Sequence, residues 1–351
     1  MIAAFALALC SACGRKGVEV SLNRDAAIYP DYMGVTVPSN IAPLNFHYTY
    51  GGIRKARTTV RCNDVVLTFS GKDVIWDMQQ WKSMLASAES DTISFLSEIS
   101  LKGGKKECLE WEIYVSPDKI DPYLSYRLIE PGYEVWHEVE IRERCVENFE
   151  ERALSDWQNT GNSCMNCHIH SQARADLSMF YVRGKNGGAF LNRNGELRKL
   201  ALNSEKMVSG TVYGEIHPSG RYGVFSSNII IPGFHTQGSR RLEVYDTESD
   251  LVIVDFDENG LSVPQALARK DVLETFPVFS ADGKSIYYCA ADTLALPREI
   301  EKLRYSLMRI AFDENTGRIG QEAEIVWDAS EHNASVCHPK CSPDGKWLLY
   351  T

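Results

Sequence analysis

A nine-residue pattern that occurs three times in the second half of the 351-residue sequence is the feature that most limits its fold. Three segments align without gaps: residues 213–221, 276–284 and 338–346. The glycines of their turns, Gly220, Gly283 and Gly345, are 63 and then 62 residues apart. A unit repeated at a fixed period is typical of propellers and solenoids, in which each unit buries its apolar face against the next one.

Each copy leads from its turn into an apolar strand, at residues 223–226, 286–289 and 347–350. More strands are predicted after the first two copies, at residues 241–246, 251–255, 306–312 and 323–327. Four strands per repeat fit the blade of a β-propeller, which closes with about four to eight blades. The sequence holds about three blades, so we expect an incomplete propeller and a natural chain that continues beyond Thr351.

The Ser-Pro-Asp-Gly-Lys turn at residues 342–346, followed by an apolar strand, resembles the repeat of TolB-like propellers. This resemblance implies a TolB-like β-propeller over residues 186–351. Its first hairpin is predicted where Asn194 and Gly195 separate two strand candidates, because both residue types adopt a left-handed backbone readily.

The first half of the chain is predicted to form a β-rich, sandwich-like domain over residues 41–149. Apolar side chains alternate with polar ones in residues 109–115, as in a strand with one buried face. Residues 60–69, 92–99 and 133–141 are further strand candidates. Asp77 is the predicted N-cap of one helix, and a second short helix is predicted at residues 150–158. The predicted fold class is therefore mainly β.

Between these two regions the chain carries Cys164-Met165-Asn166-Cys167-His168. A C-x-x-C-H pentapeptide is the attachment signature of c-type haem. Cys164 and Cys167 would form thioethers to the porphyrin, and His168 would bind the iron as an axial ligand. We therefore predict one covalent haem c in a short haem-binding segment over residues 150–185.

Other readings of the cysteine pair are a thioredoxin-like redox pair, half of a zinc site and a plain disulfide. The redox pair requires a βαβ context, and the zinc site requires a second pair of ligands. His332, Cys337 and Cys341 would be the ligands of a separate zinc cluster. Against this cluster, Cys337 and Cys341 align with Thr275 and Phe279 of the preceding repeat.

The second axial ligand decides whether the iron transfers electrons or binds a small molecule. Met179, 11 residues after His168, is one candidate, and a core methionine is its alternative reading. His235 is the other candidate, in a loop between two strands of a repeat, and a solvated loop histidine is its alternative reading.

The other histidines near these segments are expected to have structural roles. His170 is too near the motif to reach the opposite haem face. His217 belongs to the repeated turn. His338 takes the place of Tyr213 and Phe276 in the other repeats, so a packed ring is expected there.

The N-terminus resembles the processing box of bacterial lipoproteins. A short apolar run leads into Cys10-Ser11-Ala12-Cys13, which predicts a signal peptide over residues 1–13, lipidation of Cys13 and a linker over residues 14–40. An apolar N-terminal strand is the alternative. No apolar run approaches the roughly 20 residues of a membrane span, so we expect membrane contact only through the lipid. Because this haem is attached outside the cytoplasm, both features predict a periplasmic or cell-envelope location.

The formal net charge is −10 and the pI is about 5.4. Such a field repels phosphate backbones, so we discount nucleic acid as a partner. The sequence has no nucleophile elbow, P-loop, dinucleotide fingerprint or zinc-protease motif. Any catalysis is therefore expected at the iron.

Residues 120–134 read Ile-Asp-Pro-Tyr-Leu-Ser-Tyr-Arg-Leu-Ile-Glu-Pro-Gly-Tyr-Glu. With the haem motif and the repeats, this segment resembles a family of Bacteroidetes envelope proteins. The resemblance covers almost everything after residue 41 and implies a β-rich domain, one c-type haem segment and a TolB-like propeller. Cys164, Cys167 and His168 carry over as haem-binding positions, and no activity carries over.

Three functions agree with these expectations. The first is an envelope-anchored monohaem c-type cytochrome that passes electrons to a redox partner protein. The second is a binding or sensing module whose propeller recognises a protein or a glycan while the haem senses redox state or gas. The third is a haem-dependent reductase or peroxidase, which requires an open iron position beside acid and base groups.

Overall fold

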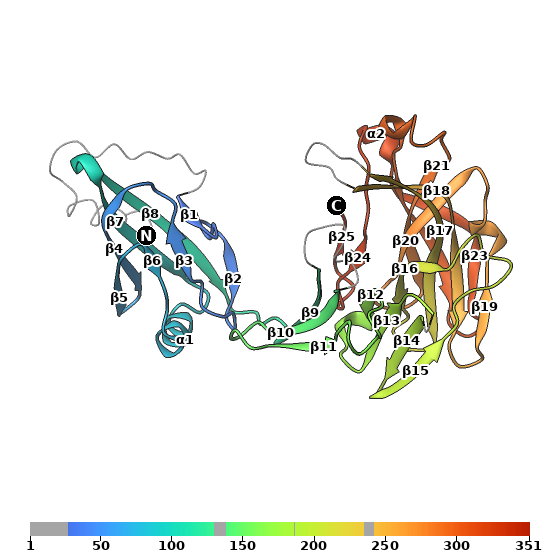
Figure 1. Cartoon of the computed structure of the whole chain (residues 1–351), viewed down its shortest axis with the longest axis horizontal. Coiled ribbons are helices and arrows are strands. Elements are labelled where there is room, and N and C mark those ends of the chain that lie inside the picture. Colours follow the sequence, from blue (N-terminus) through green and yellow to red (C-terminus); the bar gives the residue numbers. More distant parts are fainter. Residues whose placement is uncertain (1–26, 130–137, 186, 235–241) are drawn as a thin grey trace. The chain divides into compact units, whose positions relative to one another are not determined.

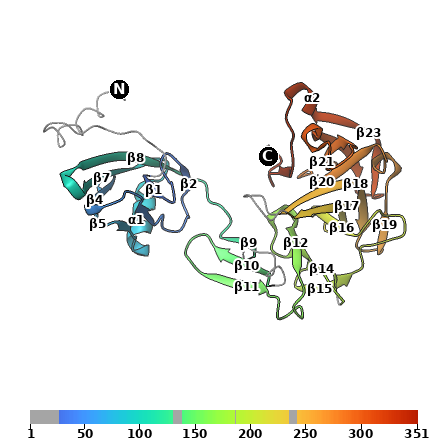
Figure 2. The ribbon, with the colours of Figure 1, turned by 45° about the horizontal axis from the view of Figure 1, so that its top comes forward.

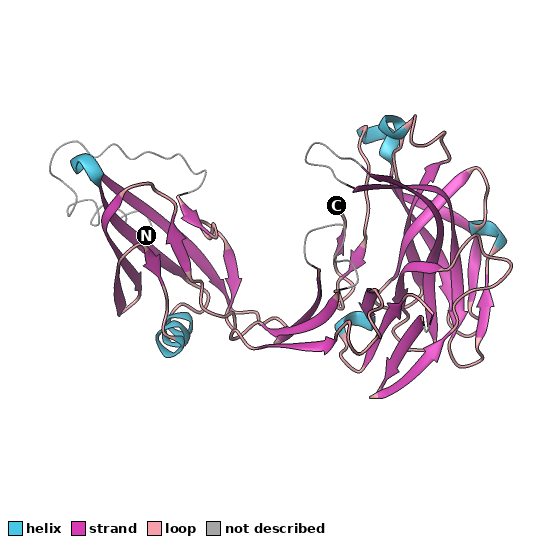
Figure 3. Ribbon diagram, viewed as in Figure 1, coloured by secondary structure: helices cyan, strands magenta, loops and turns pink. Residues whose placement is uncertain are grey.

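The computed structural model of the chain describes residues 27–129, 138–185, 187–234 and 242–351. This part of the chain is mainly β, with short helices between some of the strands (Figure 3). No helix within it is both long and apolar enough to cross a bilayer. The chain divides into two compact units, residues 1–125 with 142–153 and residues 126–141 with 154–351, and we describe each separately.

The first unit contains two sheets that share one core. The larger sheet has the order β2-β8-β7-β4-β5, with bounds β2 Thr36–Pro38, β4 Ile53–Cys62, β5 Val65–Ser70, β7 Thr92–Leu101 and β8 Lys106–Ser116. The smaller sheet has the order β1-β3-β6, with bounds β1 Ile28–Tyr29, β3 Phe46–Tyr48 and β6 Asp73–Val74. Phe95 and Trp111 stack with ring centroids 3.8 Å apart, and Phe46 of the smaller sheet lies 5.4 Å from Trp111.

Helix α1 (Met78–Ser87) begins at the predicted cap. The Asp77 carboxylate accepts hydrogen bonds from the backbone N–H groups of Gln79 and Gln80, at 2.9 and 3.0 Å. These bonds satisfy two of the amide donors that a helix start leaves without intrahelical partners. The helix buries Trp81, whose indole N–H donates to the carbonyl of Ile41 at 2.8 Å. The predicted helix is confirmed.

Two expectations for this unit differ from the structure. Residues 27–40 of the predicted linker contain β1 and β2, and Ile28 and Val37 are part of the core. The predicted strand at residues 60–69 is a hairpin, because Asn63 adopts a left-handed φ of 48° and separates β4 from β5. Of the strand predicted at residues 133–141, the first five residues lie outside the described part of the chain.

Strands β9 (Tyr123–Leu128), β10 (Glu140–Cys145) and β11 (Glu151–Ser155) form a sheet in the order β11-β10-β9. The short helix predicted at residues 150–158 is therefore wrong. Neighbouring strands pair their charges instead: Arg142 lies 2.9 Å from Glu151, and Arg152 lies 2.6 Å from Glu143. Opposite charges across adjacent strands favour the sheet, and a helix could not form both contacts.

The second unit is built from three four-stranded antiparallel sheets in which neighbours in sequence are neighbours in space, and we call them meanders 1, 2 and 3 (Figure 1). Meander 1 contains β12 (Met165–His170), β13 (Leu177–Val182), β14 (Gly188–Arg193) and β15 (Glu196–Leu200). Meander 2 contains β16 (Thr211–Ile216), β17 (Tyr222–Phe234), β18 (Leu242–Asp255) and β19 (Gly260–Ser262). Meander 3 contains β20 (Val272–Phe279), β21 (Ser285–Asp292), β22 (Ser306–Asp313) and β23 (Arg318–Trp327).

A short helix, α2 (Ala329–His332), follows meander 3 and leads to the paired strands β24 (Lys340–Cys341) and β25 (Leu348–Leu349). Figure 2 shows the meanders from a second direction. Each of the three repeated turns joins two paired strands: β16 to β17, β20 to β21 and β24 to β25. The expectation of four strands per repeat agrees with meanders 2 and 3, which contain the first two copies.

The C-x-x-C-H motif belongs to meander 1 rather than to a separate segment. Residues 165–168 are in β12, which pairs with β13, and β13 pairs with β14. The expected boundary at residue 186 therefore falls inside a sheet. The predicted hairpin is present between β14 and β15, with Asn194 and Gly195 at φ values of 54° and 86°.

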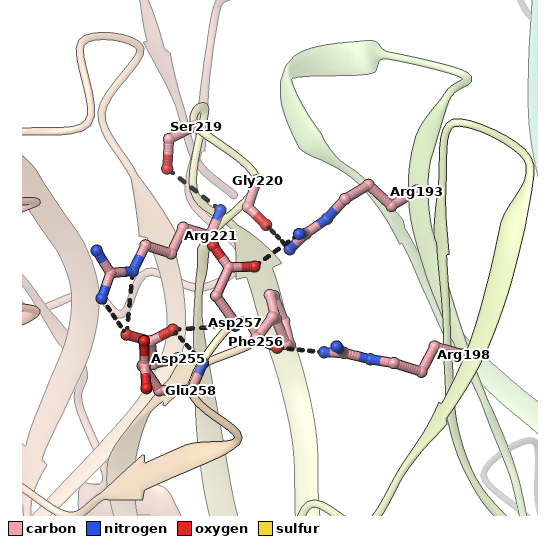
Figure 4. Close-up of polar contacts among 9 residues, drawn as sticks. All are labelled: Arg193, Arg198, Ser219, Gly220, Arg221, Asp255, Phe256, Asp257 and Glu258. Carbon is pink, nitrogen blue, oxygen red and sulfur yellow. Dashed lines mark hydrogen bonds and ion pairs between the residues drawn. The ribbon is translucent and has the colours of Figure 1, made fainter.

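Neighbouring meanders share apolar cores and polar contacts. Meanders 1 and 2 enclose a cluster of buried side chains that includes Met179, Leu191, Phe225 and Val254. At the edge of this cluster Arg193 lies 2.7 Å from Asp257 and donates to the carbonyl of Gly220, and Arg198 donates to the carbonyl of Phe256 (Figure 4). A second cluster fills the space between meanders 2 and 3.

Candidate functional site

The first strand of every meander has the same irregularity in its pairing. In β12 the register with β13 shifts between Asn166 and Ile169. Equivalent shifts occur between Thr211 and Gly214 in β16 and between Thr275 and Val278 in β20. A β-bulge of this kind releases its residues from the alternation of buried and exposed positions and re-aims their side chains.

The strand pair β24–β25 continues this pattern. Cys337 and Thr351 exchange two backbone hydrogen bonds, at 2.8 and 3.1 Å, whereas Lys340 pairs with Leu349. Residues 338 and 339 therefore lie where the other three strands have their bulges. His338 has a left-handed φ of 49°, and Phe276 in the bulge of β20 has a φ of 54°.

The bulged strands surround one cavity of about 550 Å³, which we call the bulge pocket. Its walls come from β9, β12, β16, β20 and the segment that enters β24, and every lining residue belongs to the second unit. The lining residues are Arg127, Asn166, His168, Ile169, Tyr213, Gly214, Phe276, Pro277, Val278, His338, Pro339 and Lys340. A volume of this size lies within the roughly 300–1,000 Å³ range of small-molecule and cofactor sites.

Three rings from three bulges form one group in the pocket wall. The ring of Phe276 lies 4.5 Å from that of Tyr213 and 4.0 Å from that of His338, and the rings of Tyr213 and His338 are 5.9 Å apart. The expectation of a packed ring at His338 agrees with these contacts. His338 is nevertheless an exposed residue, and it lines the pocket. Partial burial, and then the ammonium of Lys340, lower the pKa of His338.

Two cationic groups complete the pocket. Arg127 of β9 donates a hydrogen bond to the side-chain carbonyl of Asn166 at 2.5 Å. Lys340 lies 2.5 Å from the buried carboxylate of Glu215. Burial raises the pKa of Glu215, and the Lys340 ammonium opposes that effect without cancelling it. The pocket thus offers positive charge at its rim and apolar side chains and rings on its walls.

The residues of the C-x-x-C-H motif differ in their relation to the bulge pocket. Asn166 and His168, two residues apart, both line the bulge pocket. Cys164 lies directly before β12 and is not among the residues that line the pocket. It is half-buried, and its carbonyl accepts a hydrogen bond from the Arg183 amide at 2.9 Å. The backbone of Cys167 is in β12, and its side chain lies outside what the structure describes.

The structure does not bring Met179 to His168. Met179 pairs with Ile169 and Leu191 across the sheet, and its side chain is 4% exposed in the core between meanders 1 and 2. Its position matches the alternative reading, a core methionine. His235, the other candidate ligand, and Cys13, the lipidation candidate, both lie outside the described residues.

The remaining histidines have partners in the fold. His217 is 1% exposed, and its two ring nitrogens contact Ser219 Oγ at 2.8 Å and the carbonyl of Gly283 at 3.1 Å. The Nδ1 atom of His170 lies 3.2 Å from the carbonyl of Arg174. His332 stacks on Trp327 with ring centroids 4.7 Å apart.

The alternative of a zinc cluster has no geometric support. Among the residues whose positions are given, no three His, Cys, Asp or Glu side chains lie close enough to hold a metal ion. Cys337 lies 3.0 Å from the hydroxyl of Thr351, and burial raises the pKa of Cys341 to about 11. Within the described part of the chain, Cys164, Cys337 and Cys341 form no disulfide.

The residues of the bulge pocket fit a haem group. A haem is flat and largely apolar, carries two carboxylates and needs at least one axial ligand. His168 offers the ligand, Ile169, Val278 and the ring group offer apolar contact, and the two cations suit carboxylates. Sequence reasoning missed Arg127, Tyr213 and Phe276. Arg127 lies within the Asp-Pro-Tyr-Leu-Ser-Tyr-Arg-Leu-Ile stretch of the family resemblance, which was the one signal that pointed to it.

No family model matches the sequence, and no curated protein matches it. Among solved structures, the chain is similar to an oligogalacturonate lyase in complex with manganese, with 14% identity, a TM-score of 0.33 and coverage of 73% of this chain and 70% of that one. A Mycobacterium tuberculosis puromycin-hydrolyzing peptidase has 9% identity and a TM-score of 0.34 over 68% of this chain and 38% of that one. A bacterial ice-binding adhesin has 8% identity and a TM-score of 0.19 over 74% and 88%.

Proposed function

We propose that the second unit is part of a TolB-like β-propeller and that the first unit is a sandwich-like domain. Three consecutive four-stranded meanders support the propeller, because each begins with a bulged strand that lines the same pocket. In a propeller the blades are arranged around a central channel, so equivalent strands of successive blades meet at one place. The shared core of the two sheets in the first unit supports the sandwich.

We further propose that the bulge pocket holds one covalent haem c and that the protein is a monohaem electron carrier of the cell envelope. The observation that carries this proposal is that His168, the histidine of the C-x-x-C-H motif, lines a pocket with apolar walls and a cationic rim. Haem, when bound, supplies one-electron chemistry. A lipid on Cys13 would hold the protein at a membrane surface, where it meets its redox partner protein.

In this proposal the residues of the haem site have separate roles. Cys164 and Cys167 bind the porphyrin edge, and His168 binds the iron. Arg127 pairs with a haem carboxylate, and Lys340 stays paired with the buried Glu215 at the pocket wall. The rings of Tyr213 and Phe276 keep water away from the face of the haem. This exclusion protects the bound group from side reactions.

The test is to express the chain together with haem-maturation machinery and to compare the wild type with Cys164→Ala, Cys167→Ala and His168→Ala. We expect the wild-type mass to increase by one haem, retained after denaturation, and a pyridine haemochrome spectrum of a c-type haem. Loss of either cysteine should remove one thioether and shift that spectrum. Cys145→Ala, in β10 and outside the pocket lining, is the matched control and should behave as wild type.

A wild-type chain that emerges from this expression without covalent haem would contradict the proposal. The gas-sensing and enzymatic alternatives differ from electron transfer at the iron, because both require a position that a gas or substrate can occupy. Carbon monoxide added to the reduced protein separates them. An unchanged spectrum supports electron transfer, and a shifted spectrum supports the alternatives.

A further inference from the structure

Two histidines line the bulge pocket, and the sequence reasoning connected only one of them with haem. His168 is the second residue of the bulge in β12, and His338 is the first residue of the corresponding irregularity before β24. The strands β16 and β20 lie between them in the order of the repeats. The two imidazoles therefore reach one pocket from two different strands.

We propose that His338 is the second axial ligand of the haem bound by His168. The inference rests on the proposed function, because it concerns the same pocket and the same group. It differs from the two candidates drawn from the sequence, Met179, which lies in the core, and His235, which lies outside the described residues. The chain then provides both axial ligands from the irregular first strands of two repeats.

The lining of the pocket offers few other ligands for iron. Haem iron is held in proteins by His, Cys, Met or Tyr side chains. Apart from His168, the side chains of these types that line the pocket among the described residues are His338 and Tyr213. A neutral imidazole binds iron directly, whereas a phenol must first lose its proton. The amine of Lys340 is not a further candidate, because it forms an ion pair with the buried carboxylate of Glu215 at 2.5 Å.

The local backbone holds His338 in place. The two hydrogen bonds between Cys337 and Thr351 fix the residue before it, and Pro339 fixes the residue after it. One face of its ring rests on Phe276, with centroids 4.0 Å apart. Phe276 has the same left-handed backbone at the same repeat position, so this geometry belongs to the repeat. Position 338 differs from position 276 in its side chain, which is a histidine and can therefore bind iron.

The experiment compares haem-loaded, full-chain variants by optical and electron paramagnetic resonance spectroscopy. His338→Phe keeps a ring of the kind that the preceding repeat has at Phe276, so folding should be preserved. His170→Phe is the matched control, since His170 is in β12 but does not line the pocket. Tyr213→Phe and Met179→Leu test the competing ligands.

We expect a low-spin, six-coordinate iron in the wild type that ignores carbon monoxide when reduced. His338→Phe should convert the whole low-spin signal to high-spin and allow carbon monoxide to bind, and the other three variants should keep the wild-type spectra. A His338→Phe protein that stays low-spin overturns the inference, as does a five-coordinate wild type or loss of the low-spin signal in Tyr213→Phe or Met179→Leu. Failure of the proposed function has a different readout, the absence of covalent haem in the wild type.

Discussion

Glu274, in β20, is an acidic residue in an apolar environment. Its side chain is 2% exposed, and its Oε2 atom has no hydrogen-bond partner in the described part of the chain. Burial raises the pKa of this carboxyl group to about 8, and the nearby Asp250 adds to the effect. The carboxyl group is therefore mostly protonated at neutral pH, which lets the fold bury it without an uncompensated charge.

The raised pKa makes stability depend on pH. In the unfolded chain Glu274 ionises near its ordinary pKa of about 4.3, whereas in the folded chain it keeps its proton up to about pH 8. The free energy of unfolding should therefore fall as pH rises between these values, by up to about 1.4 kcal/mol per pH unit from this group. Glu274→Gln should remove this slope and stabilise the protein at pH 7 to 8.

Urea unfolding at a series of pH values measures the slope directly. Glu322→Gln, an exposed glutamate in β23, is the matched control and should keep the wild-type dependence. If Glu274→Gln has the same pH dependence as the wild type above pH 5, the interpretation of Glu274 as a buried, protonated acid is wrong.

The repeated turn is the element that most clearly links sequence to structure. In the second and third copies a serine hydroxyl donates to the aspartate two residues later, Ser280 to Asp282 and Ser342 to Asp344, both at 2.6 Å. In the first copy His217 replaces that serine, and it reaches across to the carbonyl of Gly283 in the next turn. His217 therefore stabilises the second repeated turn as well as its own.

Gly283→Ala should destabilise the protein much more than Gly345→Ala. Both glycines have a left-handed φ, near 70°, which costs an alanine about 1–2 kcal/mol. A Cβ at Gly283 would lie 2.1 Å from Nε2 of His217, whereas a Cβ at Gly345 would meet nothing closer than 3.4 Å. We expect a loss of about 2–4 kcal/mol for Gly283→Ala, measured by chemical denaturation, and less than about 2 kcal/mol for Gly345→Ala. Equal losses would show that the His217 contact is unimportant.

Elements whose signals are local could be predicted from the sequence, and elements that depend on a partner strand could not. The Asp77 cap and the Asn194-Gly195 hairpin depend on a few neighbouring residues, and both predictions are confirmed. Strand β11 was predicted as a helix because the charges that pair it with β10 are distant in sequence. The pocket could not be predicted, because a bulge changes where a side chain points without a distinct sequence pattern.

The two units have separate hydrophobic cores, and this separation should appear in unfolding. The core of the first unit contains Trp76, Trp81 and Trp111, and the second unit has its own clusters between meanders. Trp81 is fully buried, so Trp81→Ala should cost about 3–5 kcal/mol. We expect it to lower one unfolding transition and to leave a second transition unchanged.

Differential scanning calorimetry, with intrinsic fluorescence as a second probe, can measure both transitions. Leu307→Ala, in the buried part of β22, is the reciprocal variant and should lower only the transition of the second unit. A single transition that shifts in both variants would mean that the two units unfold cooperatively, contrary to this prediction.

The recurring bulge also affects how the protein can change during evolution. Bulge residues stand outside the alternation that assigns the other strand positions to the core or to solvent. Positions 168, 213, 276 and 338 line one pocket and hold two histidines, a tyrosine and a phenylalanine. Phe276 also packs against the buried cluster of Cys289, Leu307 and Val336. Single substitutions at positions 168, 213 and 338 can therefore alter the chemistry of the pocket while the architecture around it is inherited intact.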